Sequence, residues 1–333
     1  MVIGSIIVPF YNEEKTIELL LDAVYGQTYP ASKMEIVLAN GNSNDRSVEK
    51  ILEWQKGHPD LQIQIIDNPK RIIPAGLNLA IQHAAGEFII RLDAHCIPAE
   101  NYVELSIDAL LAEKGTNVGG RWDIQPGSKR GIARAIAKAA SSPFGVGDAK
   151  YRYSEQASYV DTVPFGAYRK ATLLDLGGFD ESLLTNEDYD LNVRIRRNGG
   201  KIWFDPKIRC TYFARSSLLD LAKQYWRYGF WKMRMLQKDP KSLRLRQMIP
   251  PLFVLSIPLL LIGQLIHPFF ATVISLEIIA YIMGLVFIAI RSAGDHDDLA
   301  LFWGMPAAIL VMHFCWGSGF LWSLMSLGRK RQS

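Results

Sequence analysis

Apolar runs and amphipathic stretches alternate along the first hundred residues. The short apolar runs are typical of buried parallel strands, and the stretches between them carry apolar residues at helical spacing. The runs are 3–9, 35–39, 63–66 and 87–92. The helices expected between them are 13–26, one that ends near residue 56, and 74–85. This alternation predicts right-handed crossovers and a nucleotide-binding, mostly parallel sheet that is flanked by helices.

Two details of the first crossover are predicted from single residues. Pro9 is expected to end the first strand, because proline lacks the N–H that a strand ladder uses. Asn12 is expected to cap a helix that begins at Glu13 and ends at about Gly26.

Residues 101–248 continue the pattern less regularly. Helices are expected at 101–113, 170–176, 187–197 and 217–236, and strands at 117–122, 163–168, 201–204 and 208–212. The glycine-rich, polar stretch 126–158 is expected to be a covering loop with a short helix near 132–140.

The apolar residues gather after Met248. The segments 249–267, 269–290 and 300–327 are each long enough to span a bilayer. The chain is therefore divided into an α/β domain at 1–215, an amphipathic, basic interfacial region at 216–248 and a transmembrane region at 249–328.

Basic residues precede the first apolar segment and are expected to face anionic lipid. They are Arg227, Lys232, Arg234, Lys238, Lys241, Arg244 and Arg246, with Asp239 as the single acid among them. If this region is inside, three spans place Arg329-Lys330-Arg331 outside, against the tendency of basic residues to stay inside. Either the third segment is re-entrant or interfacial, or the basic region before the first segment dominates the orientation. Three spans are the favoured expectation.

Charge and cysteine content narrow the class of protein. The net charge of +4 is small, and the basic run leads directly into an apolar segment, so no nucleic-acid partner is expected. Cys96, Cys210 and Cys315 are widely spaced and odd in number, which fits neither a disulfide framework nor a zinc site and indicates a reducing setting. The apolar core at 5–10 is too short for a signal peptide.

An acid and an imidazole follow the fourth apolar run, which ends in Arg91-Leu92-Asp93-Ala94-His95. Ligands of an open parallel sheet bind just beyond the carboxyl ends of its strands, so an Asp-x-His triplet there can hold a divalent cation against a phosphate. Farther along, Glu187 and Asp188 open a helix, which is a frequent position for acids. Each pattern alone is common, so its meaning depends on the surrounding motifs.

Several motifs in one order and spacing resemble a known family. They are Ile7-Val8-Pro9-Phe10-Tyr11-Asn12-Glu13-Glu14; Ser43-Asn44-Asp45; Asn68-Pro69-Lys70-Arg71 with Ala75-Gly76-Leu77-Asn78; Gly86-Glu87 with Arg91-Leu92-Asp93-Ala94-His95; Gly177-Gly178-Phe179-Asp180-Glu181 with Glu187-Asp188; and Gln224-Tyr225-Trp226-Arg227-Tyr228. From about residue 3 to residue 231 the chain resembles a family 2 glycosyltransferase, and within that family the membrane-attached enzymes of succinoglycan and related exopolysaccharide synthesis. The resemblance implies an α/β GT-A nucleotide-diphospho-sugar transferase fold, followed by transmembrane helices.

The resemblance implies a divalent metal, Mn²⁺ or Mg²⁺, that stabilises the leaving diphosphate. Asp93 and His95 would be its ligands; the usual family triplet is Asp-x-Asp, and an imidazole suits manganese better than magnesium. A surface helix-capping role is the alternative for His95. The nucleotide-sugar donor would contact Pro9, Tyr11, Glu13, Asn40, Arg71, Asp93 and Ala94. Asn40 stands where the family usually has an Asp that reads uracil, and Lys70 is nearly as well explained as a solvated charge.

The resemblance also assigns the acceptor side of the reaction. Asp188 would be the base that deprotonates the acceptor hydroxyl, and Glu187 would orient the acceptor. The stretch 224–228 resembles the Gln-x-x-Arg-Trp signature of processive polysaccharide synthases, with Tyr228 in place of the tryptophan. It implies acceptor binding by Gln224, Trp226 and Arg227, and an interfacial amphipathic helix is the compatible alternative.

These features predict an inverting, metal-dependent glycosyltransferase that moves a hexose, with glucose as the expected sugar, from a UDP-sugar or related donor to a lipid-linked saccharide. It is expected in exopolysaccharide or cell-surface glycan synthesis at the bacterial inner membrane, with membrane lipid as a partner and the catalytic domain in the cytoplasm. One alternative is a polyprenyl-phosphate glycosyltransferase, whose acceptor needs no base. Another is a catalytically weak, nucleotide-sugar-binding scaffold of a synthase complex, which Asn40 and His95 motivate.

Overall fold

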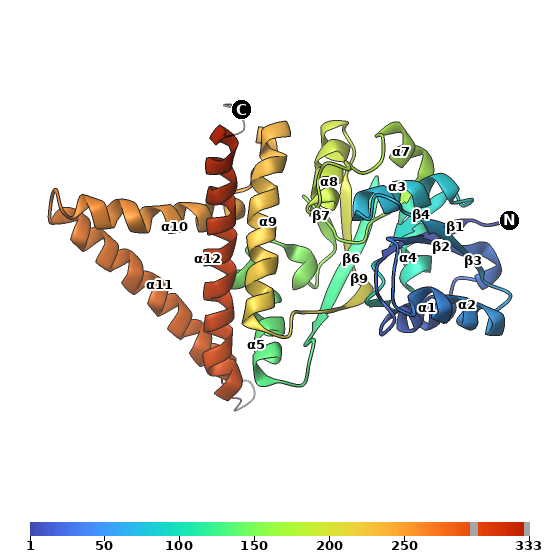
Figure 1. Ribbon diagram of the computed structural model, residues 1–333, viewed down its shortest axis with the longest axis horizontal. Helices are drawn as coiled ribbons and strands as arrows, with labels where there is room; N and C mark the ends of the chain where they lie inside the picture. Colours follow the sequence, from blue (N-terminus) through green and yellow to red (C-terminus); the bar gives the residue numbers. More distant parts are fainter. Residues whose placement is uncertain (294–298, 330–333) are drawn as a thin grey trace. The chain divides into compact units, whose positions relative to one another are not determined.

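The computed structural model describes residues 1–293 and 299–329 and divides into two compact units (Figure 1). The sheet unit comprises Met1–Asp123 and Ala149–Tyr212. The helical unit comprises Ile124–Asp148 and Phe213–Ser333.

A mixed sheet forms the centre of the sheet unit. Its strands follow the order β3-β2-β1-β4-β8-β6-β9-β5, and β7 pairs with β9. β1 to β4 run parallel, whereas β8 pairs antiparallel with β4. The bounds are β1 Gly4–Phe10, β2 Met34–Asn40, β3 Gln62–Asp67, β4 Phe88–Arg91, β5 Cys96–Pro98, β6 Asn117–Gln125, β7 Ser158–Val160, β8 Ala167–Arg169 and β9 Ile202–Phe213. The parallel sheet predicted for the first hundred residues is confirmed.

Helices cover both faces of this sheet, because its strands bury successive side chains on opposite sides. Ile6 and Ile36 lie in one core with residues of α1, α2 and α4, whereas Ile7 and Val37 lie in a second core with residues of α3, α7 and α8. The bounds are α1 Ile17–Tyr25, α2 Ser47–Gly57, α3 Ile73–His83, α4 Tyr102–Leu111, α7 Lys170–Asp175 and α8 Glu187–Arg197.

Both details predicted for the first crossover are wrong. β1 continues through Pro9 to Phe10, and α1 begins only at Ile17. Pairing of β1 with β4 ends at Ile7, so the missing N–H of Pro9 breaks no ladder on that side. Asn12 adopts a left-handed φ of 57°, and its Oδ1 accepts a hydrogen bond from the Asn44 N–H at 2.9 Å instead of capping a helix.

Two predictions for the middle of the chain also need correction. The helix expected near 132–140 is confirmed as α5 (Gly131–Ala140), but the stretch 126–158 is not one covering loop. Its residues up to Asp148, which include α5 and α6 (Pro143–Val146), belong to the helical unit, where α5 is buried against apolar residues. The strands expected at 201–204 and 208–212 are a single strand, β9. Pro206 lies between the part of β9 that pairs with β7 and the part that pairs with β5, so its missing N–H breaks neither ladder.

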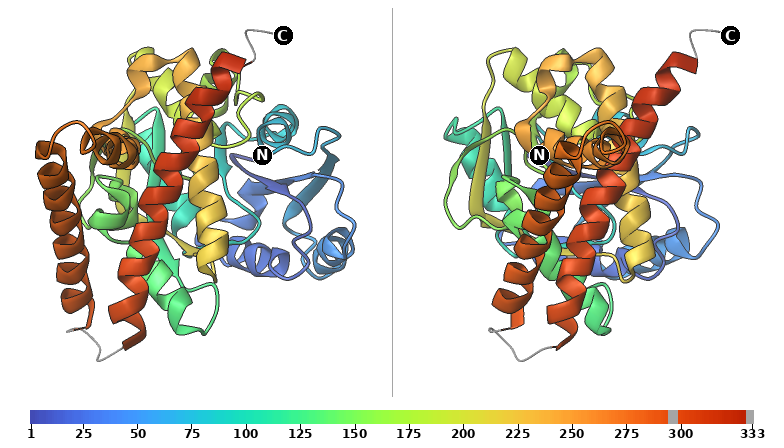
Figure 2. Two further views of the ribbon diagram at one scale, coloured as in Figure 1. Left: turned by 60° about the vertical axis from the view of Figure 1, so that its left-hand side comes forward. Right: turned by 90° about the vertical axis from the view of Figure 1, so that its left-hand side faces the viewer.

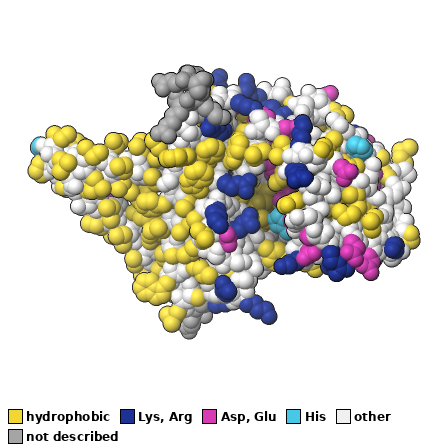
Figure 3. All heavy atoms as spheres, in the orientation of Figure 1, with side chains coloured by type: hydrophobic (Ala, Val, Ile, Leu, Met, Phe, Trp, Pro, Cys, Tyr) yellow, Lys and Arg dark blue, Asp and Glu magenta, His cyan; other side chains and the backbone are white. Residues whose placement is uncertain are grey.

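Long helices make up most of the helical unit (Figures 1 and 2). They are α9 Leu218–Lys238, α10 Leu245–Gly263, α11 Phe269–Ala293 and α12 Leu299–Arg329. α10, α11 and α12 are each long and apolar enough to cross a membrane. Hydrophobic side chains cover α10 and α11 on the face shown in Figure 3.

The basic stretch before α10 is not uniformly exposed, contrary to expectation. Lys232 is 2% exposed, and its Nζ donates to the Ser242 carbonyl at 3.2 Å. Arg246 forms an ion pair with Asp148 within the helical unit. These two cations therefore hold the unit together, while Arg227, Lys238, Lys241 and Arg244 lie at its surface.

Candidate active site

The carboxyl end of β4 carries a buried guanidinium that contacts carboxylates from two elements. Arg91 Nη2 donates to Glu187 Oε1 at 3.0 Å and to Asp93 Oδ1 at 3.3 Å, and Nη1 forms an ion pair with Asp188. Asp93 follows β4 directly, whereas Glu187 and Asp188 begin α8. These four residues, the Arg91 cluster, bring together acids that lie far apart in the sequence.

The charges of the Arg91 cluster do not balance. Burial opposes the charge of Arg91, but the carboxylates of Asp93 and Glu187 outweigh burial and raise its pKa, so the guanidinium stays charged. One cation shared by three carboxylates leaves two negative charges uncompensated within the cluster. The side chains of Asp93 and Asp188 remain 23% and 25% exposed. Such a surplus of carboxylate charge fits a divalent cation bound from the open side.

The start of α8 fixes the direction of its two acids. Asn186 adopts a left-handed φ of 70° just before the helix, and Glu187 and Asp188 lie in the first turn, where the helix dipole stabilises ionised carboxylates. Farther along α8, Arg194 donates to the carbonyl oxygens of Leu176 at 2.8 Å and Gly178 at 2.7 Å. α8 is therefore anchored to the turn Gly177-Gly178-Phe179-Asp180-Glu181 that precedes it, the glycine turn.

His95 contacts an acid from the loop that follows β1. Its Nδ1 lies 3.1 Å from Glu13 Oε1, and Thr16 Oγ1 donates to Glu13 Oε2 at 2.6 Å. Burial tends to raise the pKa of Glu13, but the hydrogen bonds from His95 and Thr16 outweigh it and lower that pKa. Glu13 is thus an ionised carboxylate that orients the imidazole, and this contact joins two of the predicted site residues.

The loops after β1 and β2 hold each other in place. The Glu13 N–H donates to Ser47 Oγ at 2.7 Å, and the Asn12 N–H donates to Ser43 Oγ at 3.1 Å. Asn40 Oδ1 accepts from the Ser43 N–H at 2.9 Å. The acceptor atom of the Asn40 amide is therefore already used within the loop, which leaves its NH₂ group to meet a ligand.

The other residues predicted to bind the donor differ in accessibility. Tyr11 is exposed and Pro9 is half-buried, whereas Ala94 is buried in the core, so any ligand contact of Ala94 would come from its backbone. Arg71 has an exposed side chain on a left-handed residue with φ 56°. Lys70 forms an ion pair with Glu181 of the glycine turn rather than standing alone in solvent.

The residues predicted to bind the acceptor lie on both units. Glu187 belongs to the Arg91 cluster, whereas Gln224, Trp226 and Arg227 lie on α9 of the helical unit. On α9, Gln224 Nε2 donates to Tyr228 Oη at 3.0 Å, and the Trp226 ring stacks on Phe230 with centroids 5.3 Å apart.

No group of three or more His, Cys, Asp or Glu side chains is arranged to hold a metal ion in the described part of the chain. Asp93 and His95 stay the predicted metal ligands, and Asp93 offers a partly exposed carboxylate beside the surplus negative charge of the Arg91 cluster.

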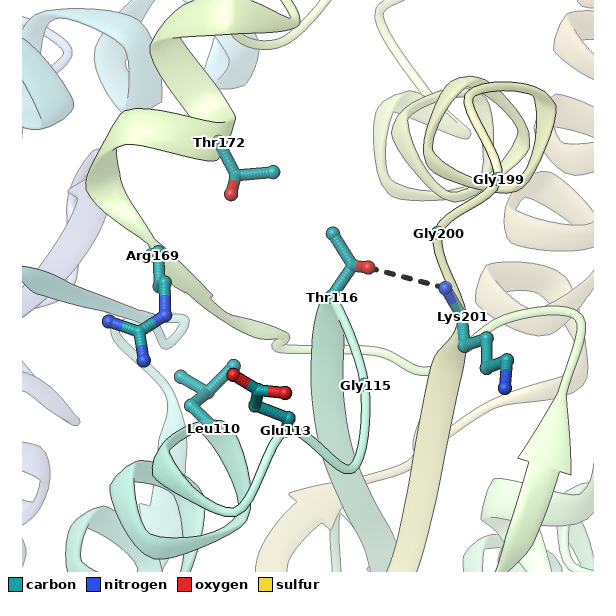
Figure 4. Close-up of a pocket in the computed structure, with 9 residues that line it drawn as sticks. All are labelled: Leu110, Glu113, Gly115, Thr116, Arg169, Thr172, Gly199, Gly200 and Lys201. Atoms are coloured by element: carbon teal, nitrogen blue, oxygen red, sulfur yellow. Dashed lines mark hydrogen bonds between the residues drawn. The ribbon is translucent and has the colours of Figure 1, made fainter.

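A separate pocket of the sheet unit is shown in Figure 4. It is lined by Leu110, Glu113, Gly115, Thr116, Arg169, Thr172, Gly199, Gly200 and Lys201. Arg169 pairs with Phe88, the first residue of β4, whereas Arg91 is the last residue of that strand. The pocket therefore lies toward the opposite edge of the sheet and contains none of the predicted site residues.

Arg91 is the part of the site that sequence reasoning missed. The motif that contains Arg91 assigns it no role, because motif and periodicity do not tell which acids share a cation. The available signal is a charge between Ile90 and Leu92, both fully buried. A buried charge requires a partner, which points to acids elsewhere in the chain.

Comparisons with known proteins find relatives of this chain. One relative is the dolichyl N-acetyl-alpha-D-glucosaminyl phosphate 3-beta-D-2,3-diacetamido-2,3-dideoxy-beta-D-glucuronosyltransferase of Methanococcus voltae. The two sequences are 30% identical over 241 residues, and the match covers 70% of this chain and 74% of that protein. The chain is 28% identical over 327 residues to the succinoglycan biosynthesis protein ExoA of Rhizobium meliloti (strain 1021), which covers 98% of this chain and 96% of that protein. The structure of the mannosyltransferase PcManGT from Pyrobaculum calidifontis in complex with GDP-Man and Mn²⁺ superposes with a TM-score of 0.61 at 20% identity, over 96% of this chain and 87% of that one.

The mixed sheet with flanking helices is a fold of the GT-A type, as the superposition with PcManGT shows. The chain belongs to glycosyl transferase family 2, whose model matches residues 5–176. The predicted family, fold class and enzyme class are confirmed.

Proposed function

We propose that this glycosyltransferase is an inverting, metal-dependent enzyme that moves a hexose, with glucose as the expected sugar, from a nucleotide-diphosphate sugar to a lipid-linked saccharide. The observation that carries the proposal is the Arg91 cluster, because one buried guanidinium contacts both the proposed metal ligand Asp93 and the proposed base Asp188. The two groups that the reaction requires are thereby held at one edge of the sheet.

Asp188 acts as the base in this proposal. Its carboxylate accepts the proton of the acceptor hydroxyl while the hydroxyl oxygen bonds to the anomeric carbon and the bond from that carbon to the diphosphate breaks. The helix N-terminus and Arg91 fix the direction of the Asp188 side chain, so it works by position as much as by basicity. The role of Glu187 as an acceptor contact stays a prediction, and its burial against Arg91 also suits it to position that guanidinium.

Asp93 and His95 would hold the metal, whose chemistry is to neutralise charge on the leaving diphosphate. Manganese is the favoured ion, since His95 supplies nitrogen where the family usually supplies oxygen and PcManGT binds Mn²⁺. Glu13 orients His95 through its contact with Nδ1.

Pro9, Tyr11, Glu13, Asn40, Arg71 and the backbone of Ala94 are proposed to bind the donor. Arg71 extends an exposed guanidinium that suits a diphosphate, and Asn40 can offer its NH₂ group to the base. A UDP-sugar is the proposed donor, and GDP-sugars are the main competitors, since PcManGT binds GDP-Man.

The acceptor is proposed to be lipid-linked and bound with the help of Gln224, Trp226 and Arg227. An exposed aromatic ring suits a sugar face, and an exposed guanidinium suits a lipid diphosphate. The names of the two relatives, one acting on a dolichyl-phosphate saccharide and one in succinoglycan biosynthesis, support this acceptor class. We place the enzyme at the bacterial inner membrane with its catalytic domain in the cytoplasm, where nucleotide sugars are made.

The test is transfer from radiolabelled nucleotide sugars into lipid-extractable product. Membranes that contain the protein are incubated with Mn²⁺ and single UDP- or GDP-sugars. One donor should label a lipid, and Asp188→Asn should lower that rate by about 10²–10⁴-fold. Asp175→Asn, an exposed carboxylate at the end of α7, is the matched control and should leave the rate unchanged. The proposal is overturned if no donor labels a lipid and if Asp188→Asn hydrolyses the nucleotide sugars as fast as the wild type does.

A second candidate is transfer to a polyprenyl phosphate. The Asp188 carboxylate is already engaged by the Arg91 guanidinium, and a phosphate acceptor needs no base. Full activity of Asp188→Asn with a product that is labile to mild acid would favour this reaction.

A further inference from the structure

α12 packs along much of its length against two amphipathic helices, α5 and α9. It runs beside α9 in Figures 1 and 2, and a Cβ added to Gly229 would collide with the backbone of Trp316. Near the carboxyl end of α12, Arg234 Nη2 donates to Ser326 Oγ at 3.0 Å. Near its start, Gly304 packs against Ala135 of α5. The depth of α12 in a membrane is therefore tied to that of α5 and α9.

α5 and α9 are unsuited to the hydrocarbon core of a bilayer. α9 exposes Lys223, Arg227 and Lys238, and α5 exposes Arg134 and Lys138. Such side chains are costly in hydrocarbon and are favoured at the lipid headgroups, with the apolar side of the helix turned inward. A helix packed between α5 and α9 has to share that interfacial depth.

α10 and α11 have the opposite character. Only 6% of the apolar window of α10 and 17% of that of α11 are buried within the protein, against 33% for α12. With 19 and 25 residues, each is long enough to cross a hydrocarbon core of about 30 Å. Glu277 of α11 accepts a hydrogen bond from Ser256 Oγ of α10 at 2.6 Å, so the acid inside this hairpin has a partner on the other helix.

α10 and α12 point in different directions. In the right-hand view of Figure 2, α10 is seen end-on while α12 is seen along its length. A bilayer crossed by α10 therefore has α12 along its surface. We infer that α10 and α11 cross the bilayer as a hairpin, with residues 264–268 on the far side, and that α12 lies in the headgroup region beside α9 instead of spanning.

This arrangement returns the chain to its starting side. With two crossings, the basic carboxyl-terminal sequence Arg329-Lys330-Arg331 stays on the side where the basic α9 lies, as Lys and Arg do in most membrane proteins. The three-span topology favoured from the sequence places this terminus on the opposite side.

Side-specific cysteine labelling tests the topology independently of catalysis. Cys96 and Cys210 are buried, so a Cys315→Ser background with no added cysteine gives the baseline. In that background Ser333→Cys, Lys223→Cys on α9 and Ile266→Cys between α10 and α11 are exposed to a membrane-impermeant maleimide. Ser333→Cys and Lys223→Cys should label from the same side, and Ile266→Cys only from the other. Labelling of Ser333→Cys from the side of Ile266→Cys overturns the inference, as does labelling of all three from one side.

Spin-label depth tests the position of α12 directly. Nitroxides are placed at Leu299, Leu310 and Leu324, which are exposed along α12, and at Leu259 of α10 as a core-depth control. An interfacial α12 gives similar, shallow depths at all three positions. A depth maximum at Leu310 that approaches that of Leu259 would show that α12 spans and would overturn the inference.

Discussion

At the scale of single residues, Arg91 is the side chain on which the proposed site depends, because three carboxylates share its charge. We expect Arg91→Met to lower the free energy of unfolding by about 3–5 kcal/mol, since buried carboxylates lose their partner. Arg91→Lys keeps the charge but lacks the planar fork that reaches several acids, so it should lose most transfer activity with a smaller loss of stability. Denaturant unfolding and transfer assays measure the two effects.

The matched control for Arg91 is Arg169→Lys. Arg169 also lies at a strand end and pairs with an acid, Glu87, but its side chain is 40% exposed. It should change neither stability nor transfer by more than a small factor. An equal loss of transfer in Arg91→Lys and Arg169→Lys would contradict the role assigned to the cluster.

His95 decides which metal the site prefers. Removal of divalent ions with a chelator should abolish transfer, and Mn²⁺ should restore it better than Mg²⁺. In His95→Asp the added carboxylate should shift the preference toward Mg²⁺, as measured by transfer rate against metal concentration. His83→Asp, an exposed histidine on α3, is the control. Metal dependence that is identical in the wild type and His95→Asp would assign His95 to the lining of the site alone.

Individual site residues were predictable from the sequence to the extent that they end strands or begin helices. Asp93 follows a buried strand and Asp188 begins a helix, and both positions gather at the carboxyl edge of a parallel sheet. The shared guanidinium was not predictable, because it depends on the meeting of residues that lie 96 positions apart. Asn12 misled for a related reason, because its side chain accepts a hydrogen bond from the Asn44 N–H, 32 positions farther along the chain, instead of capping a nearby helix.

At the scale of elements, the packing of β6 against β9 requires a residue without a side chain at Gly120. A Cβ added there would collide with the carbonyl of Ile208. We expect Gly120→Ala to destabilise the sheet unit by about 1–3 kcal/mol, because overpacking forces the strands apart. Gly57→Ala at the end of α2 has no atom within 4 Å of the added Cβ and serves as the control. Thermal unfolding followed by far-UV circular dichroism should separate the two variants; equal midpoints would contradict the packing argument.

The parallel part of the fold was predictable from the sequence and the antiparallel part was not. β1 to β4 are linked by helices whose length dictates a crossover, so pattern alone sets their neighbours. β8 inserts between β4 and β6, and β5 pairs with β9, which follows it by about a hundred residues. Those pairings depend on long-range contacts that periodicity does not record. The position of α5 was not predictable for the same reason. In the sequence α5 stands between two segments of the sheet unit, but in the structure it packs with α12 in the helical unit.

At the scale of the whole molecule, attachment to the membrane rests on the α10–α11 hairpin if the inferred topology holds. Ile282 lies in the middle of α11 and is 51% exposed. Ile282→Arg would then place a charge in hydrocarbon, at a cost of roughly 2.5–3.5 kcal/mol, and should increase the fraction of the protein that alkaline carbonate washes from membranes. Leu111→Arg, on a side chain of similar exposure at the end of α4, is the matched control and should remain as resistant to extraction as the wild type.

The salt dependence of extraction gives a second measurement. Ion pairing with headgroups is screened by salt, whereas hairpin burial is not, so extraction of Ile282→Arg should become salt-dependent while extraction of the wild type stays insensitive to salt. Equal resistance of Ile282→Arg and the wild type would mean that α11 faces protein at this position and that another part of the helical unit holds the chain in the membrane.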